Sequence, residues 1–262
     1  MQRKRSNPHK KTYSDKSKSQ ENPKANPTPS GEIRLNKYIA NSGICSRREA
    51  DKLIESGQVT VNSKVVKEMG YKVQPDDVVK HKGKRLNPEK KQYVLLNKPK
   101  GFITTTSDPK GRRTVMELVK NACDEQIFPV GRLDRATTGL LLFTNDGDLA
   151  KKLTHPSSKV KKVYQVSLDK PITRNDFLAI VDGITLEDGE VKVDDLAIVS
   201  PDDKELGIEI HMGKNRIVRR IFESFGYQVV KLDRVVFAGL TKKDLPRGQY
   251  RMLTEKEMRW IK

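Results

Sequence analysis

One stretch of the sequence decides the fold: residues 127–147, which read IFPVGRLDRATTGLLLFTNDG. An apolar approach leads into a polar loop, and a continuous apolar run follows at residues 139–144. A run of this kind predicts a strand buried on both faces. The loop would then hold Asp134 between two core strands, as rigid scaffolds do with a reacting carboxylate. An aspartate in a turn is more often a turn former, so its position alone does not decide its role.

Outward from this stretch, strands and helices alternate without a regular βαβ repeat. The periodicity predicts strands at 93–96, 163–168 and 208–211, and helices at 115–119, 149–153, 174–181 and 216–225. Such mixed order is typical of an α+β fold. Residues 93–262 are therefore expected to form one domain with a largely antiparallel mixed sheet flanked by helices.

Residues 32–86 predict a smaller unit of two short helices and a few short strands. One apolar helical face should end near Gly43. A second helix should begin at Ser46, because Ser46 and Glu49 have the spacing of a capping box. A hairpin follows over 59–65. The polar, basic stretch 87–92 is interpreted as a linker to the larger domain.

The N-terminal 31 residues are basic and almost free of apolar side chains. Residues 1–30 contain eight Lys or Arg against two acidic residues, a net +6. Such a segment buries too little to offset its ordering entropy, so we expect a disordered arm. The arm could add non-specific RNA affinity, or it could be a solvated tail without a role.

The charge of the whole chain points to a polyanionic partner. The formal net charge is +18 in 262 residues, and neutralising phosphates with Lys and Arg releases counterions. Nucleic acid is the first interpretation and an anionic membrane surface is the alternative. No apolar stretch approaches the ~20 residues that span a bilayer. The N-terminus also lacks the apolar core of a signal peptide, so a cytoplasmic location is expected.

The sequence offers little for cofactor or metal chemistry. Its two cysteines, Cys45 and Cys123, have no paired spacing and no histidine cluster, so both are expected to be packing residues. There is no phosphate-binding Walker loop and no Gly-rich dinucleotide fingerprint. We expect no metal, no nucleotide cofactor and no other cofactor.

Three segments of the smaller unit resemble the S4-type RNA-binding domain. They are Arg34–Ile39, Ser46–Ala50 and Gly57–Asn62, in the order and spacing of that family. Two arginines in the first turn of a capped helix suit a phosphate ligand better than they suit helix stability. The resemblance implies an RNA backbone facing Arg34, Lys37, Arg47, Arg48 and Lys52.

Four segments of the larger domain resemble pseudouridine synthases of the branch that modifies ribosomal RNA and carries an S4-type domain. They are Leu96–Gly101, Gly131–Leu142, Lys162–Val166 and Gly213–Arg220. Two positions depart from the family pattern: Met212 stands where an acidic residue is common, and Ile217 replaces a common Gln. Both lie at the edge of a motif and bear on RNA contacts rather than on catalysis.

The resemblance implies that a flipped-out uridine loses its glycosidic bond, turns, and is rejoined to the sugar through carbon five. This isomerisation needs no redox cofactor, metal or energy source. Asp134 matches the essential aspartate, Tyr164 the tyrosine that stacks on the base, and Arg219 the basic residue of the site. Asp134 could attack the anomeric carbon, as glycosidase carboxylates do, or remove the neighbouring sugar proton to give a glycal. The sequence leaves both routes open.

Helical spacing adds one hypothesis of its own. At 100° per residue, Arg219 lies at the flank of the apolar face of helix 216–225, where a half-buried arginine could pair with Asp134 and keep it ionised. His155 precedes a proline and is expected to be structural. Further RNA contacts are expected from Lys98, Arg132, Lys214, Arg216 and Arg220, with Lys98 and Arg132 the weaker candidates.

The implied substrate is ribosomal RNA, with large-subunit (23S) RNA in pre-ribosomal particles favoured over small-subunit RNA. The chain is expected to be a monomer, because no long exposed apolar face stands out. Two alternatives stay open. One is a synthase that acts on transfer RNA, and the other is a non-catalytic RNA-binding or ribosome-assembly factor.

Overall fold

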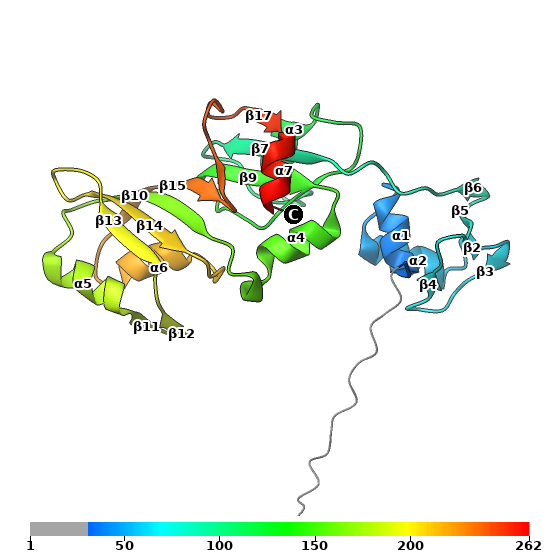
Figure 1. Ribbon diagram of the computed structural model, residues 1–262, viewed down its shortest axis with the longest axis horizontal. Helices are drawn as coiled ribbons and strands as arrows, with labels where there is room; N and C mark the ends of the chain where they lie inside the picture. The colour runs from blue at the N-terminus through cyan, green and yellow to red at the C-terminus, as the bar shows by residue number, and fades with distance from the viewer. Residues whose placement is uncertain (1–30, 262) are drawn as a thin grey trace, which may run out of the picture.

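The computed structural model of the chain describes residues 31–261 (Figure 1). The predicted basic arm lies, except for Gly31, outside the described residues. The α+β class is confirmed: a small unit with two helices precedes a larger unit with a nine-stranded, mostly antiparallel sheet. In Figure 1 the small unit lies to one side of the large sheet and the two are joined by a single crossing of the chain.

The small unit packs two helices against short strands. Helices α1 (Leu35–Asn41) and α2 (Arg47–Glu55) share one apolar core with the strands. The strands are β1 (Ile33–Arg34), which pairs with β4 (Lys72–Val73), and the sheet β3 (Lys64–Val65), β2 (Val59–Val61), β5 (Val79–His81) and β6 (Lys84–Arg85). Each helix is shorter than ~12 residues and depends on this shared core for its stability.

The capping box at the start of α2 is present. The Ser46 side chain accepts from the Glu49 N–H, and the Glu49 carboxylate accepts from the Ser46 N–H at 2.8 Å. These bonds satisfy two backbone donors that the first turn leaves free. The turn therefore tolerates Arg47 and Arg48, which both lie exposed on it.

The large unit is organised around a sheet of order β13-β14-β10-β15-β9-β7-β17. Its strands are β7 (Tyr93–Lys98), β9 (Thr138–Thr144), β10 (Lys162–Leu168), β13 (Asp195–Ile198), β14 (Glu205–Ile210), β15 (Val229–Phe237) and β17 (Tyr250–Met252), with β8 (Phe128–Pro129) and β16 (Leu240–Thr241) paired at its margins. A separate hairpin joins β11 (Ile184–Leu186) to β12 (Gly189–Val191).

Helices cover both faces of this sheet, which explains the unbroken apolar run of β9. Leu141 and Phe143 belong to one apolar cluster, whereas Leu140 and Leu142 belong to the other. The first cluster contains residues of α3 (Met116–Val119), α5 (Arg174–Asp182) and α6 (Ile217–Glu223); the second contains residues of α4 (Gly147–Thr154) and α7 (Glu255–Ile261). Alternate side chains of one strand face opposite sides, so both must be apolar.

The parallel pairing of β9 with β15 requires a glycine. Gly139 pairs with Arg234 at φ +107°, and a Cβ there would lie 2.3 Å from the Arg234 carbonyl oxygen and 2.5 Å from its nitrogen. No side chain can be accommodated at that distance. Gly139 thus allows the strand that follows the Asp134 loop to pair with a strand from near the C-terminus.

Several boundaries differ from the sequence expectations for physical reasons. Helix α4 begins at Gly147 rather than at residue 149, because the Asp146 side chain accepts from the Leu149 N–H and caps the helix. Strands β11, β12, β13, β15 and β17 and helix α7 were not expected from periodicity. Most of these elements are short or partly exposed, so their apolar and polar residues do not alternate clearly.

Within residues 31–261, the two units make a direct ionic contact. Lys37 Nζ of α1 lies 2.6 Å from the Asp148 carboxylate in the first turn of α4. The Glu89 N–H donates to the Asn41 carbonyl at 2.8 Å, and the Asn145 side chain donates to the Lys90 carbonyl. None of the helices described has the length and apolar character needed to cross a lipid bilayer.

Candidate active site

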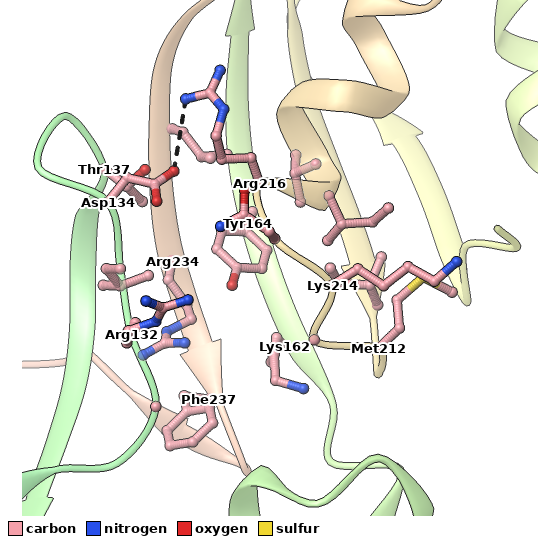
Figure 2. Close-up of a pocket in the computed structure, with 18 of the residues that line it drawn as sticks. Arg132, Asp134, Thr137, Lys162, Tyr164, Met212, Lys214, Arg216, Arg234 and Phe237 are labelled. Carbon is pink, nitrogen blue, oxygen red and sulfur yellow. Dashed lines mark ion pairs between the residues drawn. The ribbon is translucent and has the colours of Figure 1, made fainter. Parts of the chain in front are cut away.

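The loop before β9 borders a cavity of about 260 Å³ on the large unit. Its wall includes the loop 131–134, the start of β10, the segment 212–218, the end of β14 and the C-terminal half of β15. Asp134, Tyr164, Arg132, Lys214 and Arg216 all line it, although they come from segments far apart in the sequence (Figure 2). The structure therefore brings five of the predicted site residues together.

The Asp134 loop is held in place by the segment that follows β7. Lys98 Nζ donates to the carbonyl oxygens of Asp134 at 3.0 Å and Thr137 at 2.8 Å. The Gly101 N–H donates to the Arg135 carbonyl, and the Thr104 hydroxyl donates to the Leu133 carbonyl. This backbone support fixes the loop while the Asp134 side chain, 40% exposed, remains available to the cavity.

The expectation that Lys98 contacts RNA is wrong. Lys98 is completely buried and bonds to three carbonyl oxygens, those of Pro99, Asp134 and Thr137. Burial lowers the pKa of the Lys98 ammonium to about 8, although the Asp134 carboxylate acts in the opposite direction. Lys98 positions the loop, and its ammonium lies buried against the Asp134 backbone rather than at the surface.

The cation that contacts Asp134 is Arg216. Its Nη1 lies 4.0 Å from Asp134 Oδ2, and its Nη2 lies 3.0 Å from Glu223 Oε1 (Figure 2). Arg216 is the N-cap of α6 and has a left-handed backbone, with φ 47° and ψ 29°. This conformation is uncommon for a residue with a long side chain, and such positions concentrate at functional sites.

The predicted Asp134–Arg219 ion pair is not formed within 4.0 Å. Arg219 is buried and does not line the cavity; its Nη1 donates to the Val229 carbonyl at 2.7 Å and anchors α6 to β15. Desolvation and the nearby Arg216 charge lower the pKa of Arg219, while the Asp134 carboxylate raises it. Arg219 therefore interacts electrostatically with Asp134 without contacting it. A helical wheel places a residue on a face but cannot tell which neighbouring element that face contacts.

Tyr164 forms one wall of the cavity. It lies on β10, is 8% exposed, and belongs to the same apolar cluster as Val166 and Ile208. Its ring faces the space between the Asp134 loop and the segment 212–218 (Figure 2). A ring held in this way offers a rigid flat surface to a planar ligand.

The two departures from the family pattern, Met212 and Ile217, also line the cavity.

Sequence reasoning missed five polar residues of the cavity, among them Thr137, Lys162 and Arg234. The Thr137 hydroxyl is buried without a hydrogen-bond partner. Lys162 is half-buried, and Arg234 is 3% exposed. Lys162 is the first residue of β10, and Arg234 directly follows Asp233 in β15, so neither cation interrupts an apolar run that would have marked it in the sequence.

The basic residues predicted to bind RNA have mixed surroundings. Arg34, Arg47, Arg48 and Lys52 are exposed on the small unit, whereas Lys37 is paired with Asp148. On the large unit, Arg220 forms an ion pair with Asp188, and Lys214 donates to the Asp188 carbonyl at 2.8 Å. Arg132 is exposed at the rim of the cavity.

The remaining expectations concern packing residues and metals. Cys45 and Cys123 are half-buried and pack against the cores of the small and the large unit. His155 caps the short 3-10 helix η1 (Pro156–Ser158), accepting from the Ser157 N–H, so its structural role is confirmed. Among residues 31–261, no group of three or more His, Cys, Asp or Glu could hold a metal ion.

Two family profiles match the chain. The profile described as RNA pseudouridylate synthase matches residues 92–224, and the S4 domain profile matches residues 33–79. The first profile contains Asp134, Tyr164 and Arg216, and the second contains the exposed arginines of α2. These matches agree with the two units seen in the structure.

Similar proteins extend along both units. Ribosomal large subunit pseudouridine synthase B of Bacillus subtilis is 42% identical over 87% of this chain and 95% of its own length. The dual-specificity RNA pseudouridine synthase RluF of Escherichia coli is 37% identical over 88% of this chain and 78% of its own length. A crystal structure of a pseudouridylate synthase superposes with a TM-score of 0.63 and 29% identity, covering 88% of this chain and all of the other.

Proposed function

The chain belongs to the RNA pseudouridine synthase family with an N-terminal S4 domain, and from this premise we propose that it isomerises one specific uridine of ribosomal RNA to pseudouridine. The observation that carries the proposal is the meeting of Asp134 and Tyr164 in one cavity, with Arg216 beside the carboxylate. A free carboxylate, a flat aromatic wall and a cation are what glycosidic chemistry on an extruded base requires.

The reaction breaks one bond and makes another. The glycosidic bond between N1 of the uracil and C1′ of the ribose breaks, and the base turns. Carbon five then bonds to C1′ and its proton is lost, while N1 gains a proton, so the product is an isomer of the substrate. Asp134 either bonds to C1′ or removes the C2′ proton to give a glycal. In both routes it reacts as the carboxylate, and the Arg216 guanidinium lies 4.0 Å from it.

Tyr164 takes the second catalytic role in this proposal, and Arg219 takes a positioning role. Tyr164 stacks on the extruded base and accepts the carbon-five proton directly or through water. Arg219 acts at longer range, since its charge reaches Asp134 without contact. It also fixes α6, and with it Arg216, to strand β15.

The S4 domain supplies RNA affinity in this scheme. The exposed Arg34, Arg47, Arg48 and Lys52, with Lys37 beside the second unit, face the RNA backbone, and the capped first turn of α2 directs N–H groups toward phosphate. At the catalytic cavity, Arg132, Lys214 and Arg216 contact the strand that carries the target uridine, and Arg220 contacts the same RNA from outside the cavity.

We further propose large-subunit (23S) ribosomal RNA in pre-ribosomal particles as the substrate, with the enzyme acting as a cytoplasmic monomer without cofactor. The support is the similarity to a large-subunit synthase over nearly the whole of both chains. Small-subunit and transfer RNA are the alternatives, because site choice depends on RNA shape that these residues do not reveal.

The deciding experiment maps pseudouridines in a strain that lacks this protein. Carbodiimide-stop sequencing of 23S, 16S and transfer RNA should show one site missing in 23S RNA, restored by the wild-type gene but not by Asp134→Asn. Loss of a site in 16S or transfer RNA instead would identify that RNA as the substrate. Unchanged modification in all RNA, with altered ribosome assembly, would favour a non-catalytic assembly factor.

A further inference from the structure

Three cations meet at the end of the cavity that lies away from the Asp134–Arg216 contact. Arg132, Lys162 and Arg234 line this end, which Figure 2 shows below Asp134 and the Tyr164 ring. None of the three has a carboxylate within 4.0 Å among residues 31–261. Three like charges without a counter-charge are unfavourable in a folded protein unless a ligand supplies one.

Arg234 is the most constrained of the three. Its Nε donates to the Leu140 carbonyl at 2.7 Å, and its guanidinium stacks 4.5 Å from the centre of the Phe237 ring. The Nη2 group is buried and has no hydrogen-bond partner. A buried donor left unsatisfied is unfavourable, and this one belongs to a side chain that lines the cavity.

Lys162 is held beside it by backbone groups. Its Nζ donates to the carbonyl oxygens of Val160 at 3.0 Å and His211 at 2.6 Å. An ammonium has three hydrogens, so one remains for a ligand. Burial and the positive charge of Arg234 lower the pKa of Lys162 to about 8, while Asp194 acts weakly in the opposite direction.

We propose that Lys162 and Arg234, with Arg132 at the rim, bind one phosphodiester group of the RNA strand next to the extruded uridine. This inference rests on the proposed function, because it assigns the position of the substrate in the same cavity. It adds two binding residues, Lys162 and Arg234; Lys162 begins a segment that resembles the family, but the resemblance implied no role for either residue.

A phosphodiester fits these groups better than the uracil base does. The base is neutral and offers carbonyl oxygens, which cannot compensate a cluster of cations. The planar fork of a guanidinium matches the two oxygens of a phosphodiester, and an ammonium adds a point charge from a second side. The contact would hold the sugar between a fixed phosphate at one end of the cavity and Asp134 at the other.

The test uses the full chain and a dinucleotide, so no knowledge of the target uridine is needed. Lysine-labelled protein is titrated at pH 8 with uridylyl-uridine and with its uncharged methylphosphonate analogue, and the Lys162 side-chain NMR signal is followed. The signal is assigned by its loss in Lys162→Gln. We expect uridylyl-uridine to raise the pKa of Lys162 and the uncharged analogue to shift the signal much less.

Variants extend the test to affinity. Lys162→Gln and Arg234→Met should each weaken binding of uridylyl-uridine about tenfold and leave binding of the analogue nearly unchanged. Lys161→Gln, an equal charge change at an exposed neighbour outside the cavity, should have no effect. If Arg234→Met fails to fold, the half-exposed Lys162 still carries the comparison.

Two outcomes overturn the inference: equal responses to the charged and uncharged dinucleotides, or no response of Lys162 to either. Neither outcome depends on turnover. If 23S mapping succeeds while the dinucleotide test fails, only the phosphodiester site is lost. If mapping fails while Lys162 responds, the cavity binds RNA but the proposed reaction is wrong.

Discussion

Arg216 places a guanidinium nitrogen 4.0 Å from the Asp134 carboxylate, although the two residues are 82 positions apart and belong to different elements. Both side chains are about two-fifths exposed, at 44% and 40%. The pair is therefore hydrated and loose, and a substrate that excludes water would strengthen it. The geometry suits a carboxylate that must stay charged yet remain free to react.

Replacement of Asp134 by Asn should abolish catalysis without loss of RNA affinity. The amide keeps the shape of the side chain but neither attacks C1′ nor removes a proton, so turnover should fall about a thousandfold or more. Tritium release from carbon-five-labelled uridine in ribosomal RNA measures this. Asp182→Asn, on the exposed end of α5, is the matched control. Normal tritium release from Asp134→Asn would end the enzymatic assignment.

Arg216→Gln and Arg219→Gln should fail in different ways. Arg216 is exposed and contacts Asp134, so its loss should reduce kcat about tenfold to a hundredfold with little change in Tm. Arg219 is buried and bonded to Val229, so its loss should lower the free energy of unfolding by about 2 kcal/mol as well. Thermal melts and single-turnover rates separate the two; equal melting losses would contradict the assignment.

Lys98→Met should destabilise the Asp134 loop and so reduce activity. Without the ammonium, the carbonyl oxygens of Asp134 and Thr137 lose a shared donor, which should cost about 2 kcal/mol and loosen the loop. Activity should fall more than RNA binding does. Lys100→Met changes the same charge two residues along at an exposed position and should be nearly silent. A fully active, fully stable Lys98→Met protein would show that the loop needs no such support.

The affinity for phosphodiesters should fall as pH rises through about 8. Lys162 has its pKa lowered to about 8, so its ammonium is mostly present at pH 7 and mostly lost at pH 9. Binding of uridylyl-uridine should weaken about fivefold to tenfold over that range. Lys162→Arg should remove the dependence, because arginine stays charged. Lys98 also titrates near pH 8, and a pH dependence that persists in Lys162→Arg would implicate it instead.

Gly139→Ala should prevent normal folding of the large unit. The new Cβ would overlap the Arg234 backbone, at 2.3 Å from its carbonyl oxygen, and the residue would keep φ +107°. We expect a loss of at least about 3 kcal/mol in the free energy of unfolding. Gly147→Ala, in the first turn of α4 with open space around it, is the control and should be neutral or slightly stabilising. Equal stability of the two variants would contradict the close approach of β9 and β15.

The sequence predicted those features that depend on local pattern. The Ser46–Glu49 capping box, the buried strand after the Asp134 loop and the α+β class all follow from spacing and periodicity, and all are present. The cavity position of Asp134 and Tyr164 came from resemblance rather than from periodicity.

What the sequence could not give was the outcome of tertiary contact. The motif around Lys98 predicts a lysine at the surface. Instead the side chain is buried, and its ammonium donates hydrogen bonds to carbonyl oxygens of a loop 36 residues away. Arg216 and Arg219 occupy one short segment, and only the packing of α6 on β15 decides which of them reaches Asp134. Lys162 and Arg234 meet because β10 and β15 are neighbours in the sheet.

The position of β15 has a consequence for how the protein is made. This strand, residues 229–237, lies between β10 and β9, so two halves of the sheet that are synthesised earlier have no common neighbour until it arrives. The S4 domain, encoded first and closed by local pairings, can fold on the ribosome well before that. A nascent chain should therefore acquire RNA affinity early and catalytic competence only after residue 237 has been synthesised, so that products truncated before β15 would bind RNA without modifying it.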